Sequence, residues 1–379
     1  MLKSMRTKFL PGERMRYFQK QKFMELDSIL RYFILLLFLK MGFLAGGCDF
    51  NMNQPLMAQS NVVLGTSGER FTINGTPTFL LGVSYFDGRN YRESDLVTLS
   101  AKGFNLIRVW LDWREDSYLD ENGNWRSGAE QDLLRLVDFA HNQGLIVDIA
   151  ILDKDAAFGN NKSDRDLAVR NVASLLKNKR NVLFDLANEH DTSGFLLQFT
   201  HSDAADLNAL VKRIDPDRLV TISSTGCHLI CTDVNNVETG NIKAEIDEVN
   251  VDVLTPHFLR GSDWAAKTGP RLAAIKNYLQ STNRNIPIYL QEENRRNDNT
   301  GPTKDEFFEA AENAVNLGAA AWIFHTAAGF TLKGSTFFDN LDPTERLVVD
   351  ELGSRILGSS ADRMPPTSPR NVKIVIGRN

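Results

Sequence analysis

The sequence predicts an α/β protein folded as a (β/α)8 TIM barrel, a closed ring of eight parallel strands surrounded by helices. The first observation is that eight short apolar runs alternate with segments of helical periodicity across residues 62–358. The second is that the apolar runs within 182–190 and 286–293 end abruptly, the first in Asn188-Glu189 and the second in Glu292-Glu293. In a closed barrel the carboxyl ends of all strands open onto one face, so both acidic ends would meet there.

A doubly wound open sheet is the alternative architecture. Such a sheet usually carries a glycine fingerprint directly after its first strand. Residues 82–86, with the sequence GVSYF, do not supply that fingerprint. The closed barrel is therefore the fold that we expect.

Size and charge limit the classes of function. The chain has 379 residues, which suits one large barrel domain with tails. Its formal net charge of −5 argues against a nucleic-acid partner, which would require a basic face. No glycine-rich phosphate loop stands between a strand and a helix. We expect no nucleic acid, no cofactor and no bound metal, and we expect a monomer.

Composition divides the chain into four parts. Residues 1–48 are expected to form an export segment, 49–61 a tether, 62–358 the barrel, and 359–379 a linker and tail rich in proline and serine. Within the first part, residues 32–47 are mostly apolar but are interrupted by Lys40. A membrane span needs about twenty apolar residues, so this shorter run is typical of a secretory signal.

Small residues directly before Cys48 resemble a bacterial lipoprotein signal. In such a signal the cysteine is lipidated and becomes the mature N-terminus, so Cys48 would tether the protein to a membrane. The alternative is a cleaved signal peptide without lipid. Either signal predicts an exported protein that is periplasmic, anchored in the outer membrane or extracellular.

The other two cysteines, Cys227 and Cys231, lie close together in the sequence. They could form a local disulfide in an oxidising compartment, but so short a bridge needs a tight turn. We expect two thiols instead, and their spacing is not that of a structural zinc site.

The barrel domain is expected to begin with a small hairpin. Residues 62–64 and 70–73 bracket a polar segment, and Asn74-Gly75 adds a turn signal. This hairpin would cover the bottom of the barrel.

From residue 79 onward the pattern alternates between strand and helix. Residues 131–143 illustrate the helical pattern, since Leu133, Leu134, Val137 and Ala140 recur at three-to-four spacing before Gly144. Residues 226–250 lack a clear helical period and are expected to be mostly loop. The expected strands are 79–84, 106–111, 145–152, 182–187, 219–224, 252–256, 287–291 and 319–324, and the expected helices are 91–102, 131–143, 164–177, 202–214, 268–282, 303–317 and 344–357.

The two acidic strand ends are the candidate site. The run 182–187 reads as a buried strand that ends in Asn188-Glu189, and 286–291 reads as another that ends in Glu292-Glu293. Each glutamate could instead cap the following helix or pair with a nearby arginine. Two acids at equivalent ends of two barrel strands favour chemistry at that face.

These residues resemble the retaining glycoside hydrolases of the cellulase-like family 5 and its wider clan, over about residues 65–358. The Asn-Glu pair on the fourth strand and the glutamate on the seventh are the specific part of the resemblance. The weaker part is an arginine on the second strand, a histidine on the sixth and a tryptophan on the eighth, in that order. The segments that carry the resemblance are 104–109 (FNLIRV), Asn188-Glu189, His257-Phe258, 287–292 (PIYLQE) and Trp322.

The resemblance implies a division of roles. Glu189 would be the general acid/base and Glu292 the nucleophile, and this chemistry needs two carboxyl groups about 5–5.5 Å apart. The substrate would be a polysaccharide or oligosaccharide of the β-glucan or β-mannan type. The remaining implied roles are Asn188 as a partner of the sugar 2-hydroxyl, Arg108 as the group that keeps the nucleophile ionised, His257 as a lining residue and Trp322 as the floor of the subsite for the reacting sugar.

The sequence departs from the family pattern in three places. The end of the third strand, at residues 148–153, offers no histidine, and Leu259 stands where an aromatic hydroxyl usually contacts the nucleophile. Glu293 also makes the nucleophile ambiguous by one residue. Period-two alternation would put Gln291 and Glu293 on one face and Glu292 on the other, whereas the motif favours Glu292.

Aromatic and basic residues near the strand ends are candidates for holding sugar. Trp113 and Trp264, in loops, are expected to form sugar subsites, while Trp110 within a strand is expected in the core.

Arg108 could instead form a structural pair with Asp148 or Asp185. The expected alternatives for the histidines are a satisfied core residue for His257 and local hydrogen bonding for His190 and His325.

Two other functions stay open. The first is a sugar-binding barrel that has lost turnover, which the Leu259 departure motivates. The second is a metal-dependent barrel hydrolase, although no His-x-His pair follows the first strand, as such enzymes often have. Its ligands would come from Asp148, Asp153, His190, His257 and His325.

Overall fold

The computed structural model describes residues 62–153, 161–191, 199–225, 241–258, 260–297 and 300–358. All of them belong to one compact unit, Gln59–Asn379. Several sequence-based expectations lie outside the described residues: the export segment with Cys48, the tether, Cys227, Cys231, Leu259 and the C-terminal tail.

A parallel sheet forms most of the barrel wall. Seven strands lie in the order β11-β12-β4-β5-β6-β7-β8, and every neighbouring pair is parallel. The strands of the wall are β4 (Leu80–Ser84), β5 (Leu106–Trp110), β6 (Ile146–Asp153), β7 (Val182–Asn188), β8 (Leu219–Thr221), β9 (Ser223–Ser224), β10 (Thr255–Pro256), β11 (Tyr289–Leu290) and β12 (Ala321–Phe324).

Short parallel contacts close the ring between β8 and β11. Strand β9 follows β8 after one residue and pairs with β10, and Leu254 forms a parallel bridge with Ile288. The N–H of Leu254 donates to Pro287 (2.9 Å), and the N–H of Tyr289 donates to Leu254 (2.8 Å). The eight expected strands therefore form a closed (β/α)8 barrel, which confirms the predicted fold class and rules out the open sheet.

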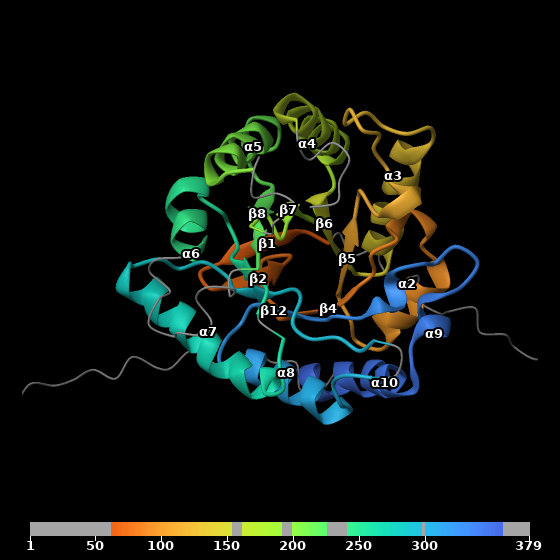
Figure 1. The fold of residues 1–379 in the computed structure, drawn as a ribbon, viewed down its shortest axis with the longest axis vertical. Helices are drawn as coiled ribbons and strands as arrows, with labels where there is room; N and C mark the ends of the chain where they lie inside the picture. The colour runs from red at the N-terminus through yellow and green to blue at the C-terminus, as the bar shows by residue number, and fades with distance from the viewer. Residues whose placement is uncertain are drawn as a thin grey trace, which may run out of the picture. The chain divides into compact units, whose positions relative to one another are not determined.

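Helices surround the ring of strands, as Figure 1 shows. Several begin with a capping box, in which a Thr or Asp side chain and an acid three residues later bond each other's backbone N–H: Thr200 for α5, Thr303 for α8 and Asp342 for α10. The helices are α2 (Glu93–Ala101), α3 (Ala129–Asn142), α4 (Lys162–Leu176), α5 (His201–Ile214), α6 (Asn241–Ala244), α7 (Trp264–Ser281), α8 (Lys304–Asn316), α9 (Phe337–Asn340) and α10 (Pro343–Leu357), with short turns η1 (Gly88–Asn90), η2 (Arg114–Asp116), η4 (Glu245–Val249) and η5 (Ala327–Gly329).

The segment that was expected to be mostly loop contains helical structure. Helix α6 continues into η4, a π-helical turn that ends at Val249. Ile242, Ile246 and Val249 are buried at spacings of four and three residues. This stripe is short, so its helical period was missed in the sequence.

A three-stranded hairpin sheet closes one end of the barrel. It consists of β1 (Leu64–Ser67), β2 (Arg70–Ile73) and β3 (Thr76–Pro77). Val62, Leu64 and Phe71 belong to the same buried cluster as inward residues of the barrel strands, such as Leu80 and Ile146. The expected cover at the bottom of the barrel is confirmed.

Polar residues follow this apolar layer along the strands. Leu106, Ile146 and Leu183 face inward in the apolar cluster, and two residues further along the same strands stand Arg108, Asp148 and Asp185, all fully buried. Because a strand side chain repeats its direction every second residue, these charged groups form the next layer inside the barrel.

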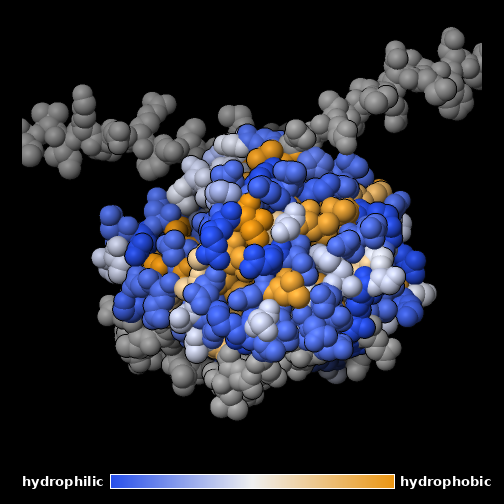
Figure 2. Space-filling view, turned by 90° about the horizontal axis from the view of Figure 1, so that it is seen from above, coloured by the Kyte–Doolittle hydropathy of each residue, from blue (hydrophilic) through white to orange (hydrophobic). Residues whose placement is uncertain are grey.

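Hydrophilic side chains cover most of the face seen in Figure 2, with smaller hydrophobic patches between them. Within the described residues, no helix combines the length and the apolar character that crossing a membrane requires. The exposed large hydrophobic residues of the described chain are Val63, Val97, Leu317 and Leu347.

Candidate active site

Arg108 is the centre of the buried polar layer. It comes from β5, and its guanidinium contacts three carboxylates. Nη1 donates to Glu292 (2.6 Å), Nη2 donates to Asp185 (2.7 Å), and Nε lies 3.2 Å from Asp148. Both structural pairs that were alternatives in the sequence therefore exist alongside the contact with Glu292.

Asp148 lies where burial disfavours its charge. Burial raises the pKa of Asp148 to about 7, although Arg108 acts in the opposite direction. The hydroxyl of Tyr289 and the amide of Gln291 both donate to Asp148 Oδ2, at 2.9 and 2.8 Å. These bonds fix Gln291 with its Nε2 toward Asp148, so that its Oε1 points the other way and accepts a hydrogen bond.

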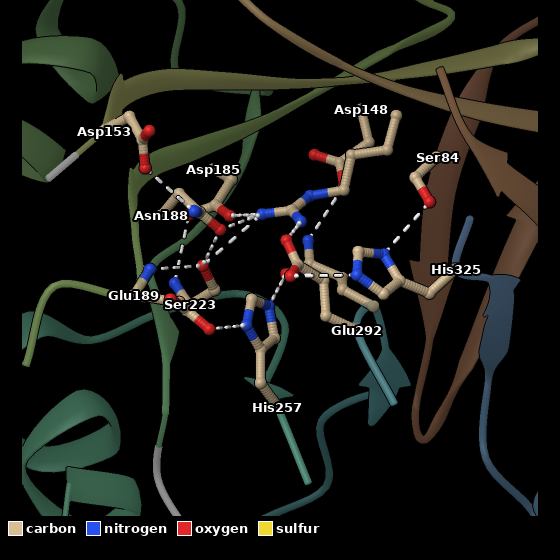
Figure 3. Close-up of polar contacts among 12 residues, drawn as sticks. Ser84, Asp148, Asp153, Asp185, Asn188, Glu189, Ser223, His257, Glu292 and His325 are labelled. Carbon is tan, nitrogen blue, oxygen red and sulfur yellow. Dashed lines mark hydrogen bonds and ion pairs between the residues drawn. The ribbon is translucent and has the colours of Figure 1, made fainter. Parts of the chain in front are cut away.

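Asn188 ends β7, and both ends of its side-chain amide are held by protein groups. Its Oδ1 accepts from Arg108 Nη2 (2.8 Å), and its Nδ2 donates to Asp153 (2.9 Å). This network orients the strand end that carries Glu189, as Figure 3 shows.

Glu189 follows Asn188 in a left-handed backbone conformation, with φ of 49°. A residue other than glycine costs roughly 1–2 kcal/mol there, and its backbone N–H donates to Ser223 Oγ at 3.2 Å. The turn redirects the side chain at the end of the strand, so that its carboxyl group meets His257 (Figure 3). Strain of this kind is typical of functional positions.

His257 connects Glu189 with the polar layer. Its Nε2 lies 3.1 Å from Gln291 Oε1, and its Nδ1 lies 3.3 Å from Glu189 Oε1. Since Gln291 Oε1 can only accept, Nε2 carries a proton, and Nδ1 faces the carboxyl group. Burial lowers the pKa of His257, but the neighbouring carboxylates of Glu292 and Glu189 outweigh burial and raise it above its usual value.

Glu292 lies opposite Glu189, with His257 beside both (Figure 3). One carboxylate oxygen of each glutamate and a ring nitrogen of His257 lie within 4.8 Å of one another. Burial raises the pKa of Glu292, but His257, His325 and Arg108 outweigh burial and lower it to about 2. Glu292 is therefore a carboxylate at neutral pH.

Glu293 points away from this site. Thr268 Oγ1 and the indole N–H of Trp322 both donate to its carboxyl group. Burial raises the pKa of Glu293 to about 7. Strict alternation along this segment was therefore wrong: β11 ends at Leu290, and beyond it Gln291 and Glu292 both face the polar layer while Glu293 faces the helices.

Two tryptophans are not where they were expected. Trp322 is 1% exposed and packs in the layer between the barrel and the helices, because its neighbours Ala321 and Ile323 are the inward residues of β12. Trp264 is also buried in that layer, with its ring edge-on to Phe307. The expectations that Trp322 floors a subsite and that Trp264 forms one are wrong.

Trp113 and Trp110 are closer to their expected positions. Trp110 is buried, as predicted, with its ring against Phe86 and 4.2 Å from the Arg108 guanidinium. Trp113 is half-buried beside the same ring and donates its indole N–H to Phe330 (2.7 Å). Its role as a sugar platform remains a prediction.

Three cationic or polar residues of the site were missed as site residues. His325, expected to bond locally, does contact Ser84 through Nδ1 (3.1 Å) but presents Nε2 3.5 Å from Glu292. Arg260 Nη2 lies 3.4 Å from Glu292, and Arg295 Nη1 lies 3.2 Å from His325 Nε2. A signal was present in the sequence, since Arg260 and Arg295 follow the ends of β10 and β11 by four and five residues.

The structure gives little support to the metal set that the sequence left open. Within the described residues, the group with clustered ligand atoms is Glu189, His257 and Glu292. Only His257 belongs to the set of five that was considered.

Two carboxyl groups at strand ends, close together and held by an arginine network, define a barrel of the glycosidase class. The model of the family Cellulase (glycosyl hydrolase family 5) matches residues 65–327. The chain belongs to this family and is a glycoside hydrolase.

Solved structures share the fold at low sequence identity. A beta-mannanase from the blue mussel Mytilus edulis is 16% identical, with a TM-score of 0.54 over 80% of this chain and 98% of that one. The hyperthermostable endo-1,4-beta-D-mannanase from Thermotoga petrophila RKU-1 is 15% identical, with a TM-score of 0.57 over 73% and 99%. A family 5 mannosidase from Rhizomucor miehei is 13% identical, with a TM-score of 0.58 over 79% and 98%. A comparison with curated protein sequences finds no match.

Proposed function

We propose that this glycoside hydrolase cleaves β-glycosidic bonds by double displacement, with Glu189 as the acid/base and Glu292 as the nucleophile. The observation that carries the proposal is the separation of the two carboxyl groups, whose nearest oxygens lie within 4.8 Å. Retaining enzymes hold these groups about 5–5.5 Å apart, whereas inverting enzymes leave about 6.5–9.5 Å for a water molecule. The short separation favours retention.

In the first step Glu292 attacks the anomeric carbon while Glu189 donates a proton to the leaving oxygen. In the second step Glu189 takes a proton from water, and that water breaks the ester bond between Glu292 and the sugar. Two charged carboxylates this close would repel each other, so the pair favours a single negative charge. The low pKa of Glu292 assigns that charge to the nucleophile.

The surrounding residues have positioning roles in this mechanism. Arg108 keeps Glu292 ionised through the contact at 2.6 Å. Asn188 lies beside Glu189 at the end of β7, where the family resemblance implies contact with the sugar 2-hydroxyl. His257 contacts Glu189 through Nδ1, at 3.3 Å, and holds its carboxyl group in place while that group exchanges protons with the substrate and water.

The substrate class is a β-linked polysaccharide or its oligosaccharides. The structures that are similar to this chain include mannanases, by their titles, and this supports β-mannan ahead of β-glucan. The experiment is hydrolysis of soluble β-mannan and β-glucan, with the anomer formed first followed by NMR. Retention supports double displacement, and inversion contradicts it.

Variants of the two acids test the assigned roles. Glu189→Ala and Glu292→Ala should each lower kcat by about 10²–10⁴-fold or more, while Glu309→Gln on the exposed face of α8 serves as a control. Full activity in either variant would remove that residue from the mechanism. Sugar binding without turnover in the wild type would instead favour the non-catalytic alternative.

We also propose that the protein is exported and lipidated at Cys48, on the basis of the apolar run and the small residues before it. The full chain expressed in a bacterium should appear in the membrane fraction and incorporate labelled palmitate. Cys48→Ser should lose the label, and Cys227→Ser should keep it. A wild-type protein without label would favour a plain signal peptide.

A further inference from the structure

Two arginines converge on one nitrogen beside the nucleophile. Arg260 Nη2 and Arg295 Nη1 each lie 3.2 Å from His325 Nε2. A guanidinium carries only donors, so Nε2 must be the accepting nitrogen of His325. Its other nitrogen, Nδ1, then carries the proton and donates to Ser84 Oγ, at 3.1 Å.

These arginines offer more donors than the protein accepts. One lone pair on His325 Nε2 cannot satisfy two guanidiniums. Arg260 also donates to the backbone oxygen of Glu293 (2.9 Å) and reaches Glu292 at 3.4 Å. Arg295 forms no ion pair with any described residue, and its Nε is buried without a hydrogen-bond partner among them.

The two positive charges of this pair are only partly balanced by the described acids, Glu292 and Glu189. Glu292 is the nearest anion, and Arg108 already donates to it at 2.6 Å. Burial and the neighbouring Arg260 lower the pKa of Arg295, because two like charges lie close together in a partly buried place. A half-buried guanidinium such as that of Arg295 gains when an anionic ligand completes its hydrogen bonds.

Two aromatic side chains, Phe330 and Trp113, lie beside the arginine pair. The Arg295 guanidinium lies 5.0 Å from the ring of Phe330, and the ring of Trp113 lies 5.0 Å from that of Phe330. Arg114 lies over both rings, 5.2 Å from Trp113 and 5.3 Å from Phe330. Sugar rings pack on aromatic side chains of this kind, and the arginines beside them favour a sugar that carries a negative charge.

We propose that Arg260 and Arg295 bind an acidic group of the substrate, the carboxylate of a uronic acid or a sulfate ester. Arg260 contacts the nucleophile, so the acidic group belongs to the sugar that Glu292 attacks or to the sugar next to it. This inference rests on the proposed function and narrows the substrate to an acidic β-glycan. Planar guanidiniums match carboxylate and sulfate oxygens through paired hydrogen bonds.

The test compares matched oligosaccharides. β-1,4-Mannan and β-1,4-glucan oligosaccharides are offered in three forms: neutral, oxidised at C6 to the uronate, and sulfated at O6. The wild type should cleave one acidic form with a kcat/KM about 10- to 100-fold higher than the neutral form. Preference for the uronate or for the sulfate identifies which of the two sources supplies the anion.

Variants then assign the preference to the arginines. Arg295→Gln should abolish most of the acidic preference while changing neutral cleavage much less, and Arg295→Lys should retain part of it because the charge remains. Arg355→Gln is the matched control, since this arginine lies far along α10 and pairs with Glu312 at the exposed surface. Circular dichroism shows whether the Arg295 variants are folded. Calorimetry then measures how tightly the acidic oligosaccharides bind to Glu189→Gln, with and without the Arg295 substitution, and so detects lost recognition.

The outcomes separate the two proposals. Cleavage of neutral and acidic forms at equal rates, unchanged by Arg295→Gln, overturns this inference and leaves the hydrolase proposal intact. Acidic oligosaccharides that bind through Arg295, with no cleavage of either the acidic or the neutral forms, overturn the proposed double displacement and leave the anion site intact. Neither cleavage nor binding of any form overturns both.

Discussion

Arg108 contacts three acids of this site, and these acids differ in their charge. Its guanidinium lies among three carboxyl groups, of which Asp148 has a pKa of about 7 because of burial and Glu292 a pKa of about 2. Coulomb attraction favours charge on the acid that also faces a second cation, and Arg260 reaches Glu292 at 3.4 Å. The arginine therefore supports one ionised nucleophile while a buried neighbour can hold a proton.

The ionisation of Glu292 can be followed through the pH dependence of kcat/KM, which reports groups of the free enzyme. A carboxylate with a lowered pKa stays ionised until the pH falls through that pKa, so the acidic limb should lie below the range of ordinary carboxyl groups. His257→Asn removes the neighbour that lowers this pKa most, and the limb should move up by about one pH unit.

The position of the limb, rather than the rate, is the measurement here, because His257 also contacts Glu189. His141→Asn on α3 is the control, and its limb should coincide with that of the wild type. A limb that stays in place in His257→Asn would contradict the electrostatic account of Glu292.

The end of β11 shows how one element serves two layers. Gln291 and Glu292 enter the polar layer, whereas Glu293 turns toward Thr268 of α7 and Trp322 of β12. Glu293 is 2% exposed and its pKa is raised to about 7 by burial. It therefore connects strands to helices as a protonated group below neutral pH.

A stability measurement tests that role. Between the ordinary carboxyl pKa and about 7, folded Glu293 keeps a proton that the unfolded chain releases, so the free energy of unfolding should fall as pH rises. Glu293→Gln has no such proton and can bond both partners. Relative to this variant, the wild type should lose about 1–3 kcal/mol between pH 5 and pH 8.

Urea unfolding at the two pH values measures this difference. Glu309→Gln, an exposed acid on α8, should leave the pH dependence of the wild type unchanged. Equal pH dependence in Glu293→Gln and the wild type would show that Glu293 is charged in the folded protein.

At the scale of the whole molecule, the hairpin sheet of β1, β2 and β3 and the site occupy opposite ends of the barrel. The apolar layer formed by Phe71 with residues such as Leu80 and Ile146 underlies the charged layer around Arg108. The hairpin sheet should therefore contribute to stability without shaping the site. Phe71 is fully buried, with its ring edge-on to Tyr289 at 6.2 Å.

Phe71→Ala should lower the free energy of unfolding by about 3–5 kcal/mol, since it leaves a cavity at the bottom of the barrel. Val63→Ala is the control in the same segment, because Val63 is 41% exposed. At temperatures where the variant is folded, kcat/KM should equal that of the wild type. A lower value would show coupling through Tyr289, whose hydroxyl bonds Asp148.

Local patterns account for what could be predicted of the fold. Eight apolar runs and the helices between them were recognisable because the hydrophobic periodicity of a strand or helix depends only on neighbouring residues. Glu189 and Glu292 were found because each stands at the end of such a run. The helical turn at 241–249 was missed because its buried stripe is too short to stand out.

The sequence by itself determined the barrel, the order of its elements and the two acids at strand ends, because these depend on local periodicity. The tertiary structure alone decided that Trp322 faces the helices, that Glu293 leaves the site, and that Arg260, Arg295 and His325 gather around Glu292. Within β12 the side chains alternate, but which face is inward depends on how the sheet closes. Past the last hydrogen-bonded pair of a strand, side-chain direction is set by packing against segments that are distant in the chain.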